Sequence, residues 1–274
     1  DIIVQTIEKN GGLIIGKTNI TEFAAGSHTY NNVFGLTKNP WNTSLSAGGS
    51  SGGSAAALAT GMSWFASGSD LGGSLRNPAS WCGVVGLRPT PGLIPHGPSS
   101  FPFFNLSVDG PMARNVEDLS IFLDAMVDHN KNDPLSFKGT KNSYYNNLFE
   151  RQESKYLIGF TDDFGVFPCD KEVRGMMQNT LKLVQNLGHD INNTYPDMSK
   201  SEYCFQTLRG YIFYCTYKSL LKKDKNLIKE EVIWNINKAK AITINDLLEA
   251  EKTRAEIYSD TMKFFDKFDF LILP

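Results

Sequence analysis

The stretch from residue 41 to residue 87 constrains this chain most, because it combines many glycines with almost no charge. Its only charged side chains are Asp70 and Arg76, and residues 41–92 hold 11 of the 24 glycines. A long uncharged stretch is typical of a buried segment, in which an isolated charge is costly and needs a partner. Because the two charges flank Ser74, we predict that they form a buried ion pair that fixes the loop around this serine. Two unrelated charges on a surface loop are the alternative.

Two motifs of glycine and serine lie in this stretch. They read Gly48-Gly49-Ser50-Ser51-Gly52-Gly53-Ser54 and Gly68-Ser69-Asp70-Leu71-Gly72-Gly73-Ser74-Leu75-Arg76-Asn77-Pro78. Gly72 and Gly73 lack side chains, so the backbone there can approach a ligand and its N–H groups can converge on one oxygen. Residues 54–59 are predicted to form a helix whose N-terminus points toward the glycine-serine loop. These features alone also suit a flexible linker or a phosphate loop, although no Gly-Lys-Ser/Thr ends the motif.

The whole segment from Gly48 to Ala79 resembles the amidase signature, and every fixed position of that long pattern is filled. Flanking segments are also similar to the family. They are Gly16-Lys17-Thr18-Asn19 with Glu22-Phe23, Asn39-Pro40, Cys82-Gly83 with Gly86-Leu87-Arg88-Pro89-Thr90, and Gly110-Pro111-Met112-Ala113-Arg114. The resemblance is strong over residues 1–127 and weaker beyond them.

This resemblance implies a Ser–Ser–Lys mechanism. By motif position Ser74 is the nucleophile, and Ser50 is the bridging serine that follows a cis peptide. A neutral lysine is the ultimate base, because a hydroxyl is a weak nucleophile and needs a positioned base. An acyl-enzyme then forms, and water releases a carboxylic acid. The oxyanion is held by the backbone amides of Leu71, Gly72, Gly73 and Ser74, and the supporting residues are Ser51, Asp70 and Arg76.

The catalytic lysine is expected outside this sequence. In the family it lies in a Lys-Asp-type segment upstream, and here no lysine occurs between Lys38 and Lys131. Lys17 belongs to a Gly-Lys-Thr-Asn segment that is structural in the family. Both ends look cut, because the chain begins at Asp1 and stops in an apolar run at Pro274. We therefore expect a catalytically incomplete chain, with Ser74 close enough to hydrogen-bond to Ser50 and no lysine amine near Ser50.

Three other functions stay open. Gly49-x-Ser51-x-Gly53 matches the nucleophile elbow of α/β-hydrolases, but residues 39–46 do not form the apolar strand that should precede it. That fold would also need an Asp and one of His96, His129 and His189. A non-catalytic binding module could use the same fold. The amidotransferase subunit that acts on misacylated tRNA is the runner-up, although the flanking motifs look more like general amidases.

The fold is predicted to be α/β, with a mixed β-sheet sandwiched between layers of α-helices in a single domain over residues 1–274, incomplete at both termini. Hydrophobic periodicity and capping residues predict the individual elements. We expect helices over 1–10, 117–127, 201–221 and 245–266 and from Asp170 to Gly188, strands over 13–15 and 156–160, a loop over 95–115 and a polar surface segment over 130–154.

Composition limits the partners. The net charge of -2 gives no general attraction to nucleic acid or to an anionic membrane, and no apolar run could span a bilayer. The four cysteines show no metal-ligand spacing, so free thiols in a reducing, cytoplasmic compartment are expected and Cys82 is expected to pack as a small apolar side chain. We expect no cofactor and no metal, and a small-molecule amide as substrate. The aromatic residues at 101–104 and 203–217 suit an acyl pocket or the core equally well.

Overall fold

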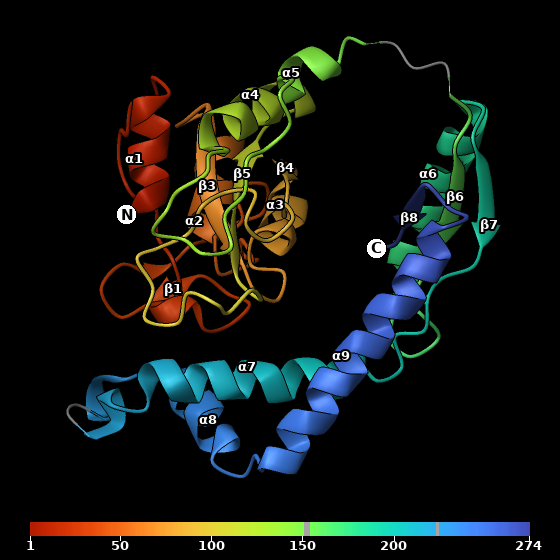
Figure 1. The fold of residues 1–274 in the computed structure, drawn as a ribbon. Coiled ribbons are helices and arrows are strands. Elements are labelled where there is room, and N and C mark those ends of the chain that lie inside the picture. Colours follow the sequence, from red (N-terminus) through yellow and green to blue (C-terminus); the bar gives the residue numbers. More distant parts are fainter. Residues whose placement is uncertain (151–153, 223–224) are drawn as a thin grey trace. The chain divides into compact units, whose positions relative to one another are not determined.

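The computed structural model describes residues 1–150, 154–222 and 225–274, so residues 151–153 of the expected polar segment lie outside the described residues (Figure 1). The chain divides into two compact units. The first comprises Asp1–Arg151 and Thr216–Asn235, and the second comprises Gln152–Cys215 and Ile236–Pro274. The expectation of one domain over the whole chain stays a prediction. Both units combine helices with a β-sheet, in agreement with the predicted α/β class.

The first unit contains a three-stranded antiparallel sheet in the order β3-β5-β4 and a two-stranded ribbon of β1 and β2. Its strands are β1 (Tyr30–Asn31), β2 (Gly35–Leu36), β3 (Phe65–Asp70), β4 (Val85–Gly86) and β5 (Val108–Ala113). Its helices are α1 (Ile2–Lys9), α2 (Gly52–Ala59), α3 (Arg76–Cys82), α4 (Val116–Met126) and α5 (Tyr144–Asn147), with short 3-10 turns at Glu22–Ala24, Leu220–Lys222 and Lys225–Leu227.

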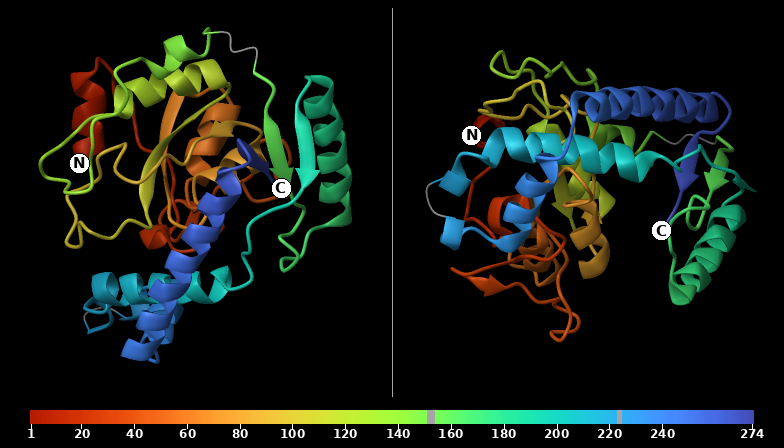
Figure 2. Two further views of the ribbon diagram at one scale, coloured as in Figure 1. Left: turned by 45° about the vertical axis from the view of Figure 1, so that its right-hand side comes forward. Right: turned by 90° about the horizontal axis from the view of Figure 1, so that it is seen from below.

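Helices cover both faces of this antiparallel sheet (Figures 1 and 2). On one face α2 and α3 pack against β5 through a cluster of small and apolar side chains that are Ala47, Ala55, Leu58, Leu75, Ala79, Cys82 and Met112. On the other face α1 and α4 form a second cluster of Ile3, Ile7, Ile94, Phe122, Leu123 and Met126. Phe65 of β3 stacks on Phe122 of α4 with ring centroids 5.2 Å apart. The predicted arrangement of a sheet between helix layers is therefore confirmed in this unit. Cys82 packs in the first cluster as a small apolar side chain, as predicted.

The structure confirms the helices predicted over 1–10 and 117–127 and shows the caps at which they begin. Asp1 caps α1 by accepting a hydrogen bond from the Ile3 amide at 3.2 Å. Asn115 caps α4 by accepting from the Asp118 amide at 2.7 Å. Side-chain caps of this kind satisfy amides that have no partner inside the helix. Helix α2 begins two residues earlier than predicted, at Gly52.

Two predictions for the first unit are wrong. Residues 13–15 form no strand, and the side chains of Leu13 and Ile15 are 84% and 73% exposed. An apolar run forms a strand only when a neighbouring strand accepts its hydrogen bonds, and none does so within the described residues. The segment over 95–115 is a loop only as far as residue 107, because residues 108–113 pair with β3 as strand β5. The sequence did not predict this strand because it contains Gly110 and Pro111, and neither residue is typical of a strand interior.

The second unit contains a three-stranded parallel sheet in the order β7-β6-β8. Its elements are β6 (Leu157–Phe160), α6 (Lys171–Asn186), β7 (Asp190–Asn193), α7 (Ser201–Tyr217), α8 (Glu230–Ala239), α9 (Ile244–Phe265) and β8 (Phe270–Ile272). The last two residues of α7 and the first six of α8 belong to the first unit. Asp170 caps α6 by accepting from the Glu172 amide at 2.8 Å, as predicted. Helix α9 begins with a capping box of Thr243 and Asp246.

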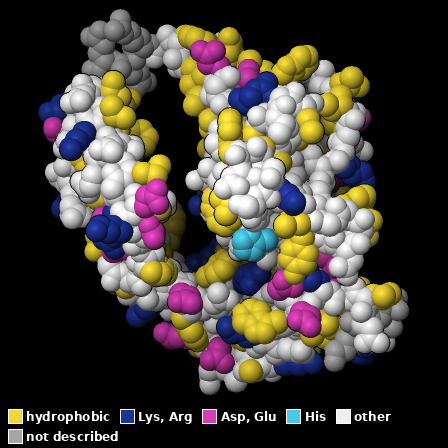
Figure 3. Space-filling model, turned by 180° about the vertical axis from the view of Figure 1, so that it is seen from behind, with side chains coloured by type: hydrophobic (Ala, Val, Ile, Leu, Met, Phe, Trp, Pro, Cys, Tyr) yellow, Lys and Arg dark blue, Asp and Glu magenta, His cyan; other side chains and the backbone are white. Residues whose placement is uncertain are grey.

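Close packing against glycine positions α9 on this parallel sheet. A side chain at Gly159 of β6 would collide with the ring of Phe264, which stacks on Phe268 with centroids 4.7 Å apart. In contrast, three of the six apolar side chains predicted to form one face of α6 are exposed. Met176 and Leu187 are 65% and 75% exposed, and Leu181 is buried. Figure 3 shows apolar side chains on the surface among charged ones. No helix in the described part of the chain is long and apolar enough to cross a membrane.

Candidate active site

The two glycine-serine motifs meet where β3 turns into α3. Strand β3 ends at Asp70 and helix α3 begins at Arg76, so Ser74 lies in the tight turn between them. The other motif leads into α2, and its Ser51 donates a backbone hydrogen bond to the Ser74 carbonyl at 3.0 Å. This bond joins two segments that are more than twenty residues apart in the sequence. The two glycine-serine motifs were predicted to form one site, and the fold brings their backbones together at Ser51 and Ser74.

The peptide between Gly49 and Ser50 is cis, as the resemblance implied. Gly49 is required here, because a Cβ at this position would lie 2.8 Å from the backbone nitrogen of His28 and 2.9 Å from the carbonyl carbon of Ser27. The side chain of Ser50 is fully buried. The glycine therefore permits close approach of the segment that precedes Thr29.

Asp70 organises the turn that carries Ser74. Its carboxylate accepts hydrogen bonds from the Gly73 amide at 2.9 Å and from the Arg76 side chain at 2.9 and 3.1 Å. The amides of Leu75 and Arg76 also donate to it at 3.3 Å, and Arg88 Nη1 donates at 3.0 Å. Burial by itself would raise the pKa of Asp70, but the hydrogen bonds from Arg76 and Gly73 and the charges of Arg76 and Arg88 lower it to about 2. Asp70 is thus a buried, ionised support for the turn.

The ion pair predicted between Asp70 and Arg76 is present, but only one partner is buried. Asp70 is fully buried, whereas 54% of the Arg76 side chain is exposed. The more buried partner is Arg88, with a side chain 23% exposed. Arg88 also contacts the Asp70 carbonyl and donates to the Leu106 carbonyl at 2.9 Å. Arg88 lies in one of the family motifs, but no role at the site was predicted for it, because a pairing across eighteen residues has no local signal.

Replacing Arg76 with alanine should therefore cost less stability than a buried pair would suggest. Arg88 keeps Asp70 paired and Arg76 is half exposed, so we expect a loss of about 1–2 kcal/mol in the free energy of unfolding. Arg88→Ala should cost more than Arg76→Ala, because it also releases two backbone carbonyls. Urea unfolding of both variants at pH 7 provides the comparison. A larger loss for Arg76→Ala than for Arg88→Ala would contradict this assignment.

The low pKa of Asp70 also predicts acid sensitivity. Its folded value of about 2 lies below the ordinary value of 3.8, so the ionised carboxylate contributes stability that is complete above about pH 4 and is lost as the pH falls toward 2. The shift corresponds to about 2 kcal/mol. We expect the difference in unfolding free energy between wild type and Asp70→Asn to shrink by that amount between about pH 5 and about pH 2. Asp128→Asn, which removes an exposed pair with Lys9, is the control.

Three of the four amides predicted to hold an oxyanion are available. The Gly73 amide donates to Asp70, so it is already engaged. Within the described residues, the amides of Leu71, Gly72 and Ser74 make no hydrogen bond. Gly73 has a φ of 98°, a backbone conformation that glycine adopts without strain. The glycine therefore shapes the turn, and the oxyanion-binding role of the neighbouring amides stays a prediction.

The expected hydrogen bond between Ser50 and Ser74 is absent. Ser50 Oγ is buried and has no hydrogen-bond partner among the described residues. Both Lys17 and Lys38 are exposed, and the expectation that no lysine amine lies near Ser50 stays a prediction. A buried hydroxyl without a partner is uncommon, because it forfeits its hydrogen bonds to water. Ser50 Oγ is thus a buried side-chain atom at this site whose bonding the described residues do not complete.

The nucleophile-elbow interpretation is not supported by the contacts of Ser51. Its hydroxyl accepts from the Ser69 amide at 3.2 Å and donates to the Ser69 carbonyl at 3.4 Å. No histidine in the described ranges is hydrogen-bonded to Ser51. His96 bonds to Asp109 at 2.7 Å, which raises its pKa, and His129 bonds to the carbonyl of residue 136 at 3.1 Å. Ser51 instead ties the start of α2 to strand β3.

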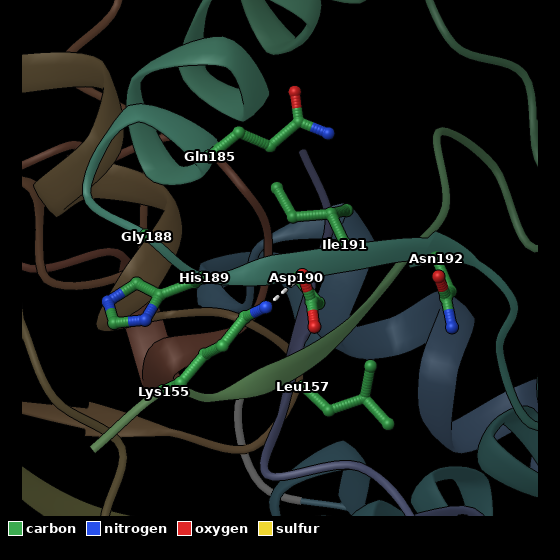
Figure 4. Close-up of a pocket in the computed structure, with 8 residues that line it drawn as sticks. All are labelled: Lys155, Leu157, Gln185, Gly188, His189, Asp190, Ile191 and Asn192. Carbon is green, nitrogen blue, oxygen red and sulfur yellow. Dashed lines mark ion pairs between the residues drawn. The ribbon is translucent and has the colours of Figure 1, made fainter.

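A separate open pocket lies in the second unit, with a volume of ≈ 560 Å³. Figure 4 shows that its lining comes from β6, the end of α6 and β7, with an ion pair between Lys155 and Asp190 at 2.9 Å. None of its lining residues belongs to the glycine-serine motifs. In the described ranges, no group of His, Cys, Asp or Glu side chains has the arrangement of a metal site.

Comparison with known proteins agrees with these features. The family model described as Amidase matches residues 1–274, and the chain belongs to this family. It is 42% identical over 191 residues to a glutamyl-tRNA(Gln) amidotransferase subunit of Thermoanaerobacter pseudethanolicus, and the match covers 69% of this chain and 38% of that protein. It is 32% identical over 276 residues to an acylamidase of Rhodococcus erythropolis, and that match covers 100% of this chain and 57% of the acylamidase. The chain thus spans 38–57% of these relatives' lengths.

Solved structures show the same fold. A bacterial aryl acylamidase of the amidase signature family superposes with a TM-score of 0.91 at 24% identity, over 100% of this chain and 58% of that one. A 6-aminohexanoate cyclic dimer hydrolase in complex with substrate gives a TM-score of 0.87 at 26% identity, over 97% of this chain and 58% of that one. The α/β class predicted from the sequence is therefore the amidase-signature fold.

Proposed function

We propose that this protein is an amidase that hydrolyses a carboxamide to a carboxylic acid and ammonia or an amine through an acyl-enzyme on Ser74. The observation that carries the proposal is that two serines lie in adjoining motifs and differ in their surroundings. Ser74 lies in a turn held by the ionised Asp70, beside three amides without partners in the described part of the chain. Ser50 is buried in the adjoining motif with an unpartnered hydroxyl. Family membership and the acylamidase relative support this chemistry.

In the proposed reaction the Ser74 oxygen attacks the amide carbonyl while its proton passes to Ser50. The negative charge that develops on the carbonyl oxygen is held by the amides of Leu71, Gly72 and Ser74. The carbon–nitrogen bond then breaks, and the leaving nitrogen takes a proton back through Ser50. Water adds to the ester on Ser74, releases the carboxylic acid and restores the serine proton.

The proton relay needs a base that contacts Ser50. No described residue fills this place, so the proposal takes the base from the family pattern, in which an upstream lysine serves. Burial among uncharged groups keeps such a lysine neutral. Members of such a coupled catalytic unit act together, so hydrolysis requires this base as well as the two serines.

A substrate panel tests the proposal. A protein that includes the base is incubated with acyl anilides, simple aryl and alkyl carboxamides and glutamine, and released amine or ammonia is measured. A fluorophosphonate probe followed by peptide mass mapping locates the nucleophile. Hydrolysis of simple amides with the label on Ser74 is expected. Labelling of Ser51, or no turnover and no labelling, would contradict the proposal.

A transamidation subunit is the second candidate, because the relative that is 42% identical is named as part of a glutamyl-tRNA(Gln) amidotransferase. The same panel separates the two functions. An amidase releases amine from anilides without any other protein. A transamidation subunit would leave the anilides intact and release ammonia from glutamine when its partner proteins and a misacylated tRNA are present.

A further inference from the structure

Thr29 makes an unusual set of contacts beside the cis peptide. Its side chain is fully buried, and its Oγ1 lies 2.9 Å from the Gly48 carbonyl oxygen and 3.0 Å from the Ser50 carbonyl oxygen. The amide of Gly52, the first residue of α2, donates to Thr29 Oγ1 at 2.9 Å. The Thr29 amide also donates to the Gly48 carbonyl at 3.0 Å. One residue therefore bridges the backbone on both sides of the Gly49–Ser50 peptide.

These bonds use the hydroxyl as donor and as acceptor. A threonine hydroxyl has one proton to share between the two carbonyls and lone pairs to accept from the amide. Without it, buried backbone groups would lose a partner, which proteins avoid. No other side chain links the Gly48 and Ser50 carbonyls within the described residues.

The segment that carries Thr29 is itself anchored. The Lys229 side chain is 7% exposed, and its Nζ donates to Thr21 Oγ1 at 2.9 Å and lies 3.6 Å from the centre of the Tyr30 ring. The Tyr30 hydroxyl donates to Glu231 at 2.6 Å. Residues 229–231 thus hold both ends of the segment over 21–30. Thr29 acts on the Ser50 backbone from a fixed position.

We propose that Thr29 is a positioning residue for Ser50, whose hydroxyl holds the Ser50 backbone so that Oγ can receive the proton of Ser74. This inference rests on the proposed amidase function. Proton transfer between two hydroxyls depends on their separation and alignment, and a displacement of about 1 Å lowers a rate by roughly 100-fold. Thr29 itself does not touch the substrate or transfer the proton.

Thr29→Val tests the inference, because valine keeps the shape and removes the hydroxyl. We expect kcat for amide hydrolysis to fall by roughly 10- to 100-fold while KM changes less than about threefold. Thr29→Ser, which restores the hydroxyl, should return kcat to within about threefold of wild type. The labelling rate of Ser74 should fall with kcat.

Ser136→Ala is the matched control. The Ser136 hydroxyl also lies between two carbonyls and one amide, at 2.9 Å from the Asn130 carbonyl, 2.8 Å from the Asp133 carbonyl and 3.1 Å from the Asn130 amide. It is 9% exposed and far from the glycine-serine motifs in the sequence. Ser136→Ala should lower the urea midpoint in the way that Thr29→Val does and leave kcat unchanged. This pairing separates a loss of stability from a loss of catalytic alignment.

The outcomes are distinct. If wild type neither hydrolyses amides nor labels at Ser74, the proposed function fails, and Thr29 has no relay to position. If wild type is active and folded Thr29→Val keeps its kcat, the inference is overturned and the proposed function stands. If Thr29→Val does not fold, Thr29→Cys is measured, since a thiol is a weak donor. An intermediate kcat supports the inference, and a wild-type kcat overturns it.

Discussion

Ser74→Ala is expected to abolish amide hydrolysis, with kcat falling by roughly 10⁴- to 10⁶-fold. The loss is large because the variant has no atom that can form the acyl-enzyme, and the other groups at the site act only together with it. Steady-state rates on the substrate panel and mass mapping of the fluorophosphonate label provide the measurement. No label should appear on the variant.

Two further variants make this result specific. Ser50→Ala should keep weak activity, with a loss of roughly 10²- to 10⁴-fold, because it removes the proton relay and leaves the nucleophile. Ser80→Ala removes an exposed hydroxyl on the same helix α3 and should leave both kcat and labelling unchanged. A Ser74→Ala variant that is still labelled, above all on Ser51, would favour the nucleophile elbow.

Asp70→Ala should be the most destabilising single change at this site. It leaves the guanidinium of Arg88, whose side chain is 23% exposed, and the Gly73 amide without their partner. Breaking a buried ion pair from one side typically costs about 3–5 kcal/mol, and we expect a loss of that size in urea unfolding at pH 7. The turn that carries Ser74 should loosen, so labelling of Ser74 should also slow.

Asp128→Ala is the control for this effect. Asp128 pairs with Lys9 at 2.8 Å, but their side chains are 30% and 68% exposed, so removal of the pair should cost less than about 1 kcal/mol. Equal losses for the two variants would show that Asp70 does not hold the turn in the way that its hydrogen bonds indicate.

The features that could be read from the sequence are those whose cause is local. The helices α1, α4 and α6 begin at capping residues and follow helical spacing, both of which are properties of neighbouring positions. The ion pair of Asp70 and Arg76 spans six residues within one turn, so it could be predicted from the positions of the two charges in the sequence. The roles given to Ser74 and Ser50 came from a long family pattern, and they stay predictions until the enzyme is assayed.

Other features were decided by the tertiary structure alone. Arg88 reaches Asp70, and Thr29 reaches Ser50, through contacts between segments eighteen to twenty-one residues apart. The exposure of Leu13 and the strand β5 depend in the same way on whether a neighbouring strand is present. A hydrogen bond across such a separation depends on where the fold places each segment, and that position cannot be predicted from the periodicity or spacing of the sequence. The sequence therefore determined the turn around Ser74 and the pair of Asp70 and Arg76 within it, and only the packing of distant segments brought in Arg88 and Thr29.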